Sequence, residues 1–552
     1  MAKYTGALSL TWANKHLRLL SHEDGSYEWV EPSDFRVSEV RLLHNVSSVG
    51  EVHPDRSRAK DNLLIRGESL HALTSLLRVP EFAAEYEGKV KLVYIDPPFN
   101  TGQTFTHYDD GLEHSVWLTM LRDRLVQIKR LLSDDGSVWV HLDDYEQHRA
   151  RVVLDEVFGS ANFVSTIIWQ KVTGRDNRTA VSQSHDYIHV YAQSGAKWKN
   201  VRNLLPRSEE AAARYGNLDN DARGPWASDN MSAKAGPGRR ASQFYTVTLP
   251  SGRKVDPPSG SCWRFTEERF VELVADNRVW FGPDGNNVPR YKRFLSEVQD
   301  GLVPLTIWPS TEVGSNDTAK KEIKELFPGI TPFDTPKPER LMQRILYIGS
   351  NPGDIVLDCF AGSGTTAAVA HKLGRRWVTC EWSAGNITTF TLPRLEKVVN
   401  NEDAGGISED VEWKGGGGFR LLDVAPSVYE VDGSTVLLSD SVTAGELAES
   451  VAAQLNFEYE LDGVFIGRKG RMRLAVIDGV LNEDIVRILV GALGDKERVT
   501  VVATAAEPGA EDLLRNLCQG SRVRKVPRDL AHLSAQRSQV VQLVLDGLGD
   551  AV

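Results

Sequence analysis

The sequence contains few residues of the kinds that build disulfide frameworks and metal centres. Its 552 residues include only four cysteines, which are Cys262, Cys359, Cys380 and Cys518. Their wide spacing excludes the paired patterns of zinc sites, so we expect no metal and a reducing, cytoplasmic environment. No apolar run reaches the roughly 20 residues that a membrane-spanning helix needs, and residues 1–30 lack a secretory pattern. We therefore expect no membrane partner.

The sequence also lacks the overall positive charge that is typical of nucleic-acid-binding proteins, because its net charge is −11. The charge is unevenly distributed, however: residues 171–255 hold 14 Lys and Arg against 7 Asp and Glu. A basic stretch on an acidic body can form a phosphate-binding face. A solvated, loop-rich insertion has the same composition, so charge alone leaves both interpretations open.

The hydrophobic pattern indicates an α/β fold in two separated stretches. In the first, we expect a strand from residue 61, a helix over 70–77 capped by Ser69, a strand over 90–96, a helix over 115–133 and a strand over 137–142. In the second, Thr335-Pro336-Lys337-Pro338 fits a cap and first turn before a helix over 341–348, and residues 354–381 read as strand, Gly turn, helix and strand. Such alternation favours a parallel sheet covered on both faces.

The Gly turn has the features of a nucleoside-binding site. Asp358 ends a buried strand, Gly362 and Gly364 permit a tight turn, and the free N–H groups of the helix from Thr365 face any ligand there. Glu381 ends the next strand, where an acid suits a ribose diol. A nicotinamide cofactor is the weaker alternative, because the turn is not G-x-G-x-x-G. A strand–helix connection without any ligand remains the other interpretation.

Asp96-Pro97-Pro98-Phe99 follows a hydrophobic strand and predicts a pocket for an aromatic amine. The prolines make the backbone rigid and leave it without N–H donors. The Asp96 carboxylate and the Pro97 carbonyl then offer two acceptors, and Phe99 offers a stacking plane. An exocyclic NH₂ group on a flat ring has two hydrogens and matches this set. A base must leave the duplex to reach such a pocket. The alternative is a turn that only ends a strand.

In this order, the two motifs resemble those of the beta-class DNA amino-methyltransferases, in which Asp-Pro-Pro-aromatic precedes Phe-x-Gly-x-Gly, here Phe360 to Gly364. The nearest resemblance is to the modification subunits of type III restriction systems. Tyr94 to Gly102 is similar to their catalytic motif. Further similar segments are 137–146, 185–191, 335–341 and 415–419. The resemblance implies S-adenosylmethionine as cofactor and a Rossmann-like methyltransferase sheet with circularly permuted motif order, since permutation keeps every strand neighbour.

The resemblance also implies roles for single residues. Asp96, Pro97, Pro98 and Phe99 would hold the target base. The cofactor-binding positions would be Asp358, Phe360, Gly362, Gly364, Thr365 and Lys337, with Glu381 on the ribose. Gly67-Glu68 stands where the family usually has Gly-Asp against the cofactor adenine, and Glu is one methylene longer.

These motifs define the domains that we expect. Residues 1–60 form an N-terminal segment, 61–200 and 306–400 the two parts of the catalytic domain, and 401–420 a Gly-rich linker. Aromatics are interleaved with the charges of residues 171–330, namely Trp198, Trp226, Phe244, Tyr245, Trp263 and Phe265. Within this stretch, residues 201–305 would be an inserted target-recognition region that contacts phosphates and stacks bases. Residues 421–552 would be a small α/β domain with a capping box at Thr443 and strands over 464–466, 474–477 and 499–503.

We expect an adenine-N6 methyltransferase acting on double-stranded DNA at specific sites, in restriction-modification or phage defence. Methylation of the cytosine amino group is the alternative within the class, although the family usually carries Ser in place of Asp96 for that substrate. RNA fits less well, given the inserted region. A non-catalytic recognition or scaffold subunit is the alternative from another class, and the intact Asp-Pro-Pro-Phe argues against it. The C-terminal domain would contact a restriction helicase–nuclease subunit, form a homodimer, or only stabilise the fold.

Overall fold

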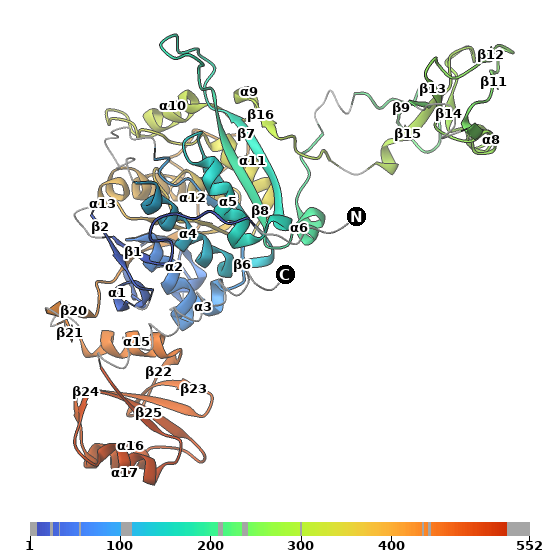
Figure 1. Cartoon of the computed structure of the whole chain (residues 1–552). Coiled ribbons are helices and arrows are strands. Elements are labelled where there is room, and N and C mark those ends of the chain that lie inside the picture. Colours follow the sequence, from blue (N-terminus) through green and yellow to red (C-terminus); the bar gives the residue numbers. More distant parts are fainter. Residues whose placement is uncertain are drawn as a thin grey trace. The chain divides into compact units, whose positions relative to one another are not determined.

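The computed structural model of the chain describes residues 8–21, 26–32, 34–53, 57–100, 113–207, 213–234, 241–298, 301–432, 435–439 and 443–526. The chain forms two compact units. One consists of Leu204–Pro304, and the other of Met1–Asn203 together with Leu305–Val552 (Figure 1). In the part of the chain given above, no helix combines the length and the apolar character that crossing a membrane requires.

A ten-stranded, mostly parallel sheet forms the centre of the larger unit. Its spatial order is β16-β7-β8-β6-β5-β17-β18-β4-β19-β3. The strands are β3 (Leu43–Gly50), β4 (Asn62–Arg66), β5 (Val90–Ile95), β6 (Leu132–Leu142), β7 (Phe163–Gln170), β8 (His185–Ala192), β16 (Ile307–Trp308), β17 (Ile355–Asp358), β18 (Arg376–Glu381) and β19 (Gly418–Val424). The six strands from β6 to β19 are all parallel to their neighbours, whereas β8 and β3 are antiparallel to the strands beside them.

The strands that carry the two motifs are neighbours in this sheet. β5 leads to Asp96 and β17 ends at Asp358, and the two strands pair in parallel with Leu357 opposite Val93. Both strands are apolar and almost wholly buried, as strands covered on two faces are. Because the carboxyl ends of parallel strands meet at one edge, the motifs lie side by side although 262 residues of chain separate Asp96 from Asp358.

Helices cover both faces of the sheet. One layer contains α2 (Ser69–Arg78), α3 (Pro80–Tyr86), α4 (His114–Leu131) and α5 (Gln147–Phe158). The other contains α9 (Ser310–Val313), α11 (Glu339–Gly349), α12 (Thr365–Lys372) and α14 (Leu392–Val399), with α10 (Asn316–Leu326) nearby. This arrangement is the parallel sheet covered by helices on both faces that the alternating pattern predicted. The core between the first layer and the sheet includes Leu73, Phe82, Trp117, Leu125 and Leu154.

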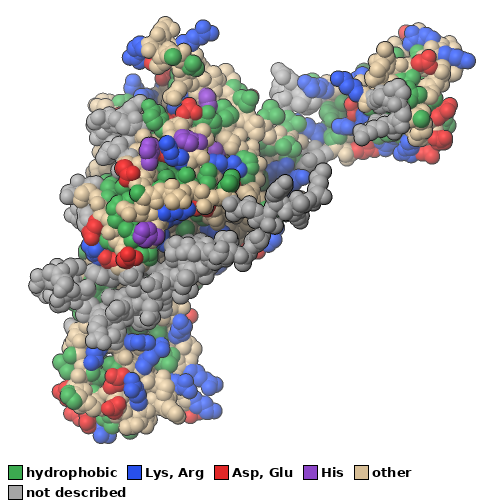
Figure 2. Space-filling model, viewed as in Figure 1, with side chains coloured by type: hydrophobic (Ala, Val, Ile, Leu, Met, Phe, Trp, Pro, Cys, Tyr) green, Lys and Arg blue, Asp and Glu red, His purple; other side chains and the backbone are tan. Residues whose placement is uncertain are grey.

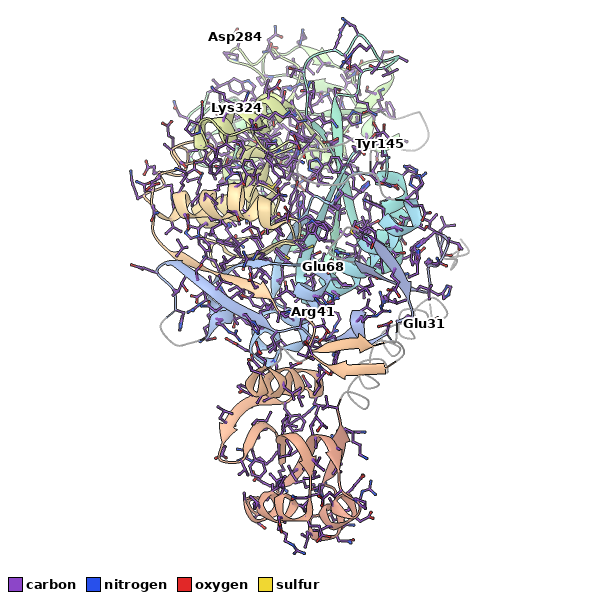
Figure 3. The ribbon with its side chains drawn as sticks, turned by 90° about the vertical axis from the view of Figure 1, so that its left-hand side faces the viewer. Glu31, Arg41, Glu68, Tyr145, Asp284 and Lys324 are labelled. Carbon is purple, nitrogen blue, oxygen red and sulfur yellow. The ribbon has the colours of Figure 1, made fainter. Side chains whose placement is uncertain are left out.

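Three local predictions differ from the structure at element ends. Helix α2 is capped by Glu68, whose carboxylate accepts from the N–H groups of Leu70 and His71 at 2.6 and 3.1 Å, rather than by Ser69. Glu68 lies between β4 and α2, separated from the end of β4 by Gly67 (Figure 3). Strand β6 begins at Leu132 instead of Ser137, because the register shifts between Val90 and Leu92 on β5. Helix α11 starts only at Glu339, since Thr335 and Lys337 each precede a proline and are pushed into extended backbone.

The Gly-rich stretch that we expected to be a linker belongs to the packed core. Ile407 is fully buried and its N–H donates to Glu339 Oε2 at 3.0 Å. Asp403 pairs with the buried Lys372 at 2.8 Å. Strand β19 begins at Gly418 and joins the main sheet between β4 and β3. The glycines at 415–417 all have positive φ, so they form a defined turn that leads into β19.

The unit Leu204–Pro304 has its own small core. It contains β9 (Trp226–Asn230), β10 (Ser232–Lys234), β11 (Val247–Thr248), β12 (Lys254–Val255), β13 (Ser261–Trp263), α8 (Glu267–Ala275), β14 (Val279–Trp280) and β15 (Arg290–Phe294). Most of the aromatics that we expected to stack on bases are structural: Trp226 and Trp263 are buried, and Tyr245 and Phe265 pack on this core. Phe244 is the exposed one of the set, and Trp198 lies in the other unit on α6 (Gly195–Val201).

The C-terminal part of the chain builds a second sheet in the order β22-β23-β24-β25-β26. Its elements are β20 (Tyr429–Asp432), β21 (Thr435–Leu438), α15 (Ala444–Leu455), β22 (Glu458–Asp462), β23 (Phe465–Lys469), β24 (Met472–Leu481), α16 (Glu483–Gly491), β25 (Arg498–Ala506), α17 (Ala510–Leu517) and β26 (Arg522–Lys525). The capping box at Thr443 and Glu446 opens α15 as predicted. The three predicted strands correspond to β23, β24 and β25.

Candidate active site

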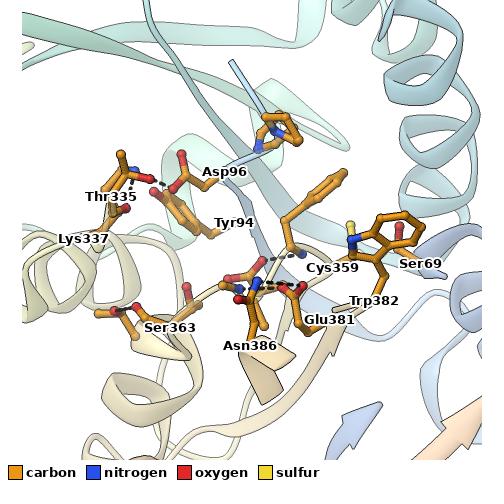
Figure 4. Close-up of a pocket in the computed structure, with 18 of the residues that line it drawn as sticks. Ser69, Tyr94, Asp96, Thr335, Lys337, Cys359, Ser363, Glu381, Trp382 and Asn386 are labelled. Atoms are coloured by element: carbon orange, nitrogen blue, oxygen red, sulfur yellow. Dashed lines mark hydrogen bonds and ion pairs between the residues drawn. The ribbon is translucent and has the colours of Figure 1, made fainter. Parts of the chain in front are cut away.

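A cavity opens at the edge of the main sheet where β5, β17 and β18 end. Its lining includes the predicted residues Asp96, Pro97, Pro98, Phe99, Glu68, Lys337, Asp358, Phe360, Gly362, Thr365 and Glu381. Figure 4 shows Asp96 and Lys337 on one side of the cavity and Glu381, Trp382 and Asn386 on the other. The two motifs therefore face one space.

Asp96 presents one occupied and one free oxygen. Its Oδ2 accepts from Lys337 Nζ at 2.5 Å, whereas its buried Oδ1 has no hydrogen-bond partner among the described residues. The Pro98 carbonyl accepts from Trp117 Nε1 at 2.6 Å, which anchors the dipeptide to α4. In the same described part of the chain, no hydrogen bond reaches the Pro97 carbonyl. Two acceptors thus remain available at the pocket, and a buried free acceptor is costly unless a ligand satisfies it.

The ring of Phe99 has two close neighbours, Lys337 and His141. Lys337 Nζ lies 5.3 Å from its centroid, and the ring of His141 lies 5.9 Å away at a tilt of 31°. His141 is fully buried and bonded to Tyr94 Oη at 2.8 Å and to Asp186 at 3.3 Å. Burial lowers the pKa of His141, and the neighbouring Asp186 opposes this shift. His141, Tyr94 and Asp186 therefore form a buried hydrogen-bonded network beside the ring of Phe99.

The Gly turn meets the acid at the end of β18. Gly362 donates its N–H to Glu381 Oε2 at 2.9 Å, and Ser383 donates its N–H to Glu381 Oε1 at 3.0 Å. Gly362 has φ +51°, and a Cβ there would approach Phe333 to 3.2 Å, so the turn needs glycine. Gly364, with φ +77°, precedes α12 but does not line the cavity.

Burial changes the acidity of the carboxyl groups at this end. It raises the pKa of Asp358 to about 7, against hydrogen bonds from Thr366 and from the Phe360 N–H. Burial also raises the pKa of Glu381, while the N–H groups of Ser383 and Gly362 lower it. Asp358 is therefore poised to change charge near neutral pH, and a cation in the cavity would favour its ionised form.

Glu68 lines the cavity, whereas its neighbour Gly67 does not. The Glu68 carboxylate caps α2 and pairs with Arg124, so much of its bonding capacity is already used. Gly67 does not line the cavity; a Cβ there would lie 2.7 Å from the side chain of Val424, which explains the glycine. Lys337, predicted among the cofactor-binding residues, contacts the base motif instead of the Gly turn. Thr101 and Gly102 of the similar catalytic motif lie outside the described residues.

Several lining residues were not predicted from the sequence. They include Tyr27, Ser69, Tyr94, Met120, Arg124, Phe333, Thr366, Trp382 and Asn386. Trp382 directly follows Glu381 and is 51% exposed at the cavity wall. The sequence signal for Trp382 was an aromatic residue directly after Glu381, the acid that ends β18. Arg124 lies in the middle of α4, where a charged residue on a buried helix marks a functional or paired site.

The comparisons with known proteins agree with this geometry. The sequence model of a family described as "DNA methylase" matches residues 90–391. The StyLTI Mod subunit of Salmonella typhimurium, a type III restriction-modification enzyme, is 29% identical over 62% of this chain and 53% of its own length. The EcoP15I Mod subunit of Escherichia coli is 27% identical over 65% of this chain and 63% of its own length. The chain thus spans between half and two thirds of these relatives.

Among solved structures, the M1.HpyAVI–SAM complex is similar over 60% of this chain and 99% of that chain, with a TM-score of 0.30 and 14% identity. The parallel sheet and the adjacent placement of the two motifs agree with the match to this family. The chain belongs to the DNA methylase family.

S-adenosylmethionine is the cofactor of this family, and the residues present fit it. Four carboxyl groups line the cavity, from Glu68, Asp96, Asp358 and Glu381, against the two cations Arg124 and Lys337. The cofactor has a sulfonium, an ammonium and one carboxylate, so its net charge is positive and complements this excess of acids. The Glu381 carboxylate, beside the Gly turn, is placed for a diol.

Proposed function

We propose that this chain methylates the exocyclic N6 amine of an adenine that has been flipped out of duplex DNA at a specific site. One observation carries the proposal: Asp96 Oδ1 is buried without a partner beside the Pro97 carbonyl and the Phe99 ring. Two acceptors and a stacking plane match a flat base with an NH₂ group. Asp in place of Ser at position 96 favours adenine over cytosine, by resemblance to the family.

The cofactor, when bound, supplies an electrophilic methyl group on its sulfonium. Asp96 Oδ1 and the Pro97 carbonyl accept the two amino hydrogens and so draw the nitrogen lone pair out of conjugation with the ring. Phe99 fixes the plane of the base, and Lys337 fixes the Asp96 carboxylate through Oδ2. Asp96 Oδ1 also accepts the proton that the nitrogen loses after methyl transfer. Most of the rate acceleration on this account is positioning.

The setting that we infer is a type III restriction-modification system. The relatives StyLTI and EcoP15I are Mod subunits of such enzymes. A restriction helicase–nuclease subunit is the partner that this setting supplies, and the separate unit Leu204–Pro304 would hold the recognition surface. A separate unit for recognition is consistent with a larger unit that carries both motifs.

The test is modification mapping in a host that lacks DNA methylation. The full chain and its Asp96→Ala variant are expressed, and genomic DNA is sequenced by a method that detects modified adenine and cytosine. We expect methyladenine at one recurring site, absent with Asp96→Ala and retained with the control Asp134→Ala, whose side chain is 85% exposed and pairs with Lys197. Modified cytosine in place of modified adenine would change the assigned target base but leave the assigned catalytic pocket unchanged. Normal methylation by Asp96→Ala would overturn the assigned pocket.

A further inference from the structure

The C-terminal domain separates its charges between the two ends of its sheet. β24, β25 and β26 are parallel, with Met472 opposite Arg498 and Thr500 opposite Arg522, so their amino ends lie together. The turn between β23 and β24 ends at the same place, because Lys469 pairs with Met472. Six cations gather at this end, which we call the basic edge: Arg468, Lys469, Arg471, Lys496, Arg498 and Arg522.

All six side chains of the basic edge are exposed. Within the described part of the chain, none of them makes an ion pair with a carboxylate. Arg468 instead donates to the Gly470 carbonyl at 3.0 Å, and Arg522 donates to Thr500 Oγ1 at 3.2 Å. The side chain of Arg498 lies against Gly520, where a Cβ would approach it to 3.1 Å. Figure 2 shows Lys and Arg side chains along one side of this domain.

The acids of the domain are placed elsewhere or already engaged. Glu497 pairs with the buried Arg473 and accepts from the Gly494 N–H. Asp495 is the exposed acid nearest the basic edge along the chain. At the opposite end of the sheet, Glu483 and Glu511 lie in the first turns of α16 and α17 and pair with Arg487 and Arg515. The exposed Glu458, which lies opposite Arg468 in the sheet, and Asp495 are the exceptions, so the six cations of the basic edge remain in excess on a chain whose net charge is −11.

Exposed like charges at close spacing repel one another and do not stabilise the fold, so their grouping calls for an external anion. Neighbouring strands are about 4.8 Å apart, so cations on three adjacent strands form a row about 10 Å long. Guanidinium groups bind phosphate oxygens in a bidentate manner. A duplex carries a continuous line of phosphates, which a row of cations can follow.

We propose that the basic edge is a second, sequence-independent contact surface for the phosphate backbone of duplex DNA. The proposal rests on the proposed function, which makes a duplex the substrate. The basic edge adds affinity outside the recognised site and the methyl-transfer pocket. An acidic protein surface is the competing ligand, and the test below distinguishes it.

The experiment compares two double variants of the full chain that lose equal charge. Arg498→Ala with Arg522→Ala removes two cations from the basic edge, whereas Arg487→Ala with Arg515→Ala removes two ion-paired cations of the same domain that are 59% and 60% exposed. The dissociation constant for a duplex without a recognition site is measured between 50 and 200 mM salt. Each lost phosphate contact reduces the slope of log K against log salt by about 0.9, so we expect a slope smaller by about 1.8 for the first variant and unchanged for the second.

A second variant guards against misfolding. Arg498→Lys with Arg522→Lys keeps the charge, and we expect it to keep the wild-type slope. Equal slopes for the wild type and the basic-edge variant, or equal changes in both double variants, would overturn the proposal and favour an acidic protein ligand or a general charge effect. Wild-type chain that binds no duplex at all would instead refute the proposed function, so the two failures are distinguishable.

Discussion

Lys337 Nζ lies 2.5 Å from Asp96 Oδ2, although 241 residues separate the two positions in the chain. The ion pair joins the loop before α11 to the end of β5, and it is nearly closed to solvent, since the Lys337 side chain is 6% exposed. It leaves Asp96 Oδ1 free and aimed at the cavity. One cation thus fixes which oxygen of the carboxylate is available to substrate.

Replacing Lys337 with Met should impair catalysis more than cofactor binding. Without its partner, the Asp96 carboxylate can rotate, and small misplacements in a site that works by positioning cost about 100-fold in rate. We expect single-turnover methylation to fall by roughly that factor, with the dissociation constant for S-adenosylmethionine nearly unchanged. Lys197→Met, which removes an exposed pair with Asp134, serves as the control and should retain the wild-type rate. A large loss of cofactor affinity in Lys337→Met would instead show that Lys337 binds the cofactor.

Phe99→Ala should weaken capture of the flipped base. Stacking of one base on an aromatic ring contributes about 1–3 kcal/mol, and Phe99 is the ring beside Asp96. Fluorescence of 2-aminopurine at the target position should show a smaller flipped fraction, while Phe99→Tyr should behave like the wild type. An unchanged fluorescence signal in Phe99→Ala would mean that another ring holds the base.

Cofactor affinity should depend on pH through Asp358. Burial raises the pKa of Asp358 to about 7, so the group is neutral below that value and negative above it. Because the cofactor is a net cation, its affinity should rise as pH increases from 6 to 8. Asp358→Asn should flatten this dependence in calorimetric titrations, and a dependence that persists in this variant would assign it to another group.

Asp358 should also lower the free energy of unfolding at neutral and alkaline pH. A raised pKa means that the folded state binds the Asp358 proton more tightly than the unfolded state, so the penalty is absent below the ordinary value of 3.8 and complete above about 7. Asp358→Asn should therefore raise the free energy of unfolding at pH 8 by on the order of 2–4 kcal/mol, and by much less near pH 4. Chemical denaturation at the two pH values measures this difference. A gain of the same size at both would show that packing, not charge, is responsible.

Glu339→Gln should destabilise the catalytic unit. The buried Glu339 carboxylate accepts from Lys372 at 2.8 Å, from Arg394 at 2.8 Å and from the N–H of Ile407. Removing one member of a buried ionic group leaves the others uncompensated and costs about 3–5 kcal/mol. Thermal unfolding should show the loss. Glu325→Gln, at an exposed pair with Lys321 on α10, should shift the transition little.

The strands and the motifs were predictable because their signals are local. Apolar runs ending in Asp96 and Asp358, with a proline pair and a Gly turn, identify both element type and chemistry within a few residues. The alternation of strands and helices then implies a parallel sheet, and parallel strands bring their carboxyl ends together. The capping box at Thr443 was also readable, because its partner is three residues away.

What escaped prediction depends on distant partners. Glu68 caps α2 and pairs with Arg124 on α4, and neither contact could be predicted from the local sequence. Lys337 meets Asp96 only in the folded sheet. The glycines before β19 read as a linker because composition does not show that Glu339 and Lys372 hold Asp403 and Ile407 in the core. Trp226 and Trp263 looked available for stacking, and only tertiary packing shows that they are buried.

The chain enters and leaves the unit Leu204–Pro304 at one point. Leu205 and Leu302 exchange backbone hydrogen bonds of 2.9 and 2.7 Å, so the two connecting segments are tied to each other. No strand of the main sheet lies between them. A unit joined through such a narrow neck can be replaced by another of different sequence without disturbing the pocket around Asp96 and Asp358. If this unit holds the recognition surface, as proposed above, its exchange alone would change the DNA site that is methylated and leave the catalytic residues as they are.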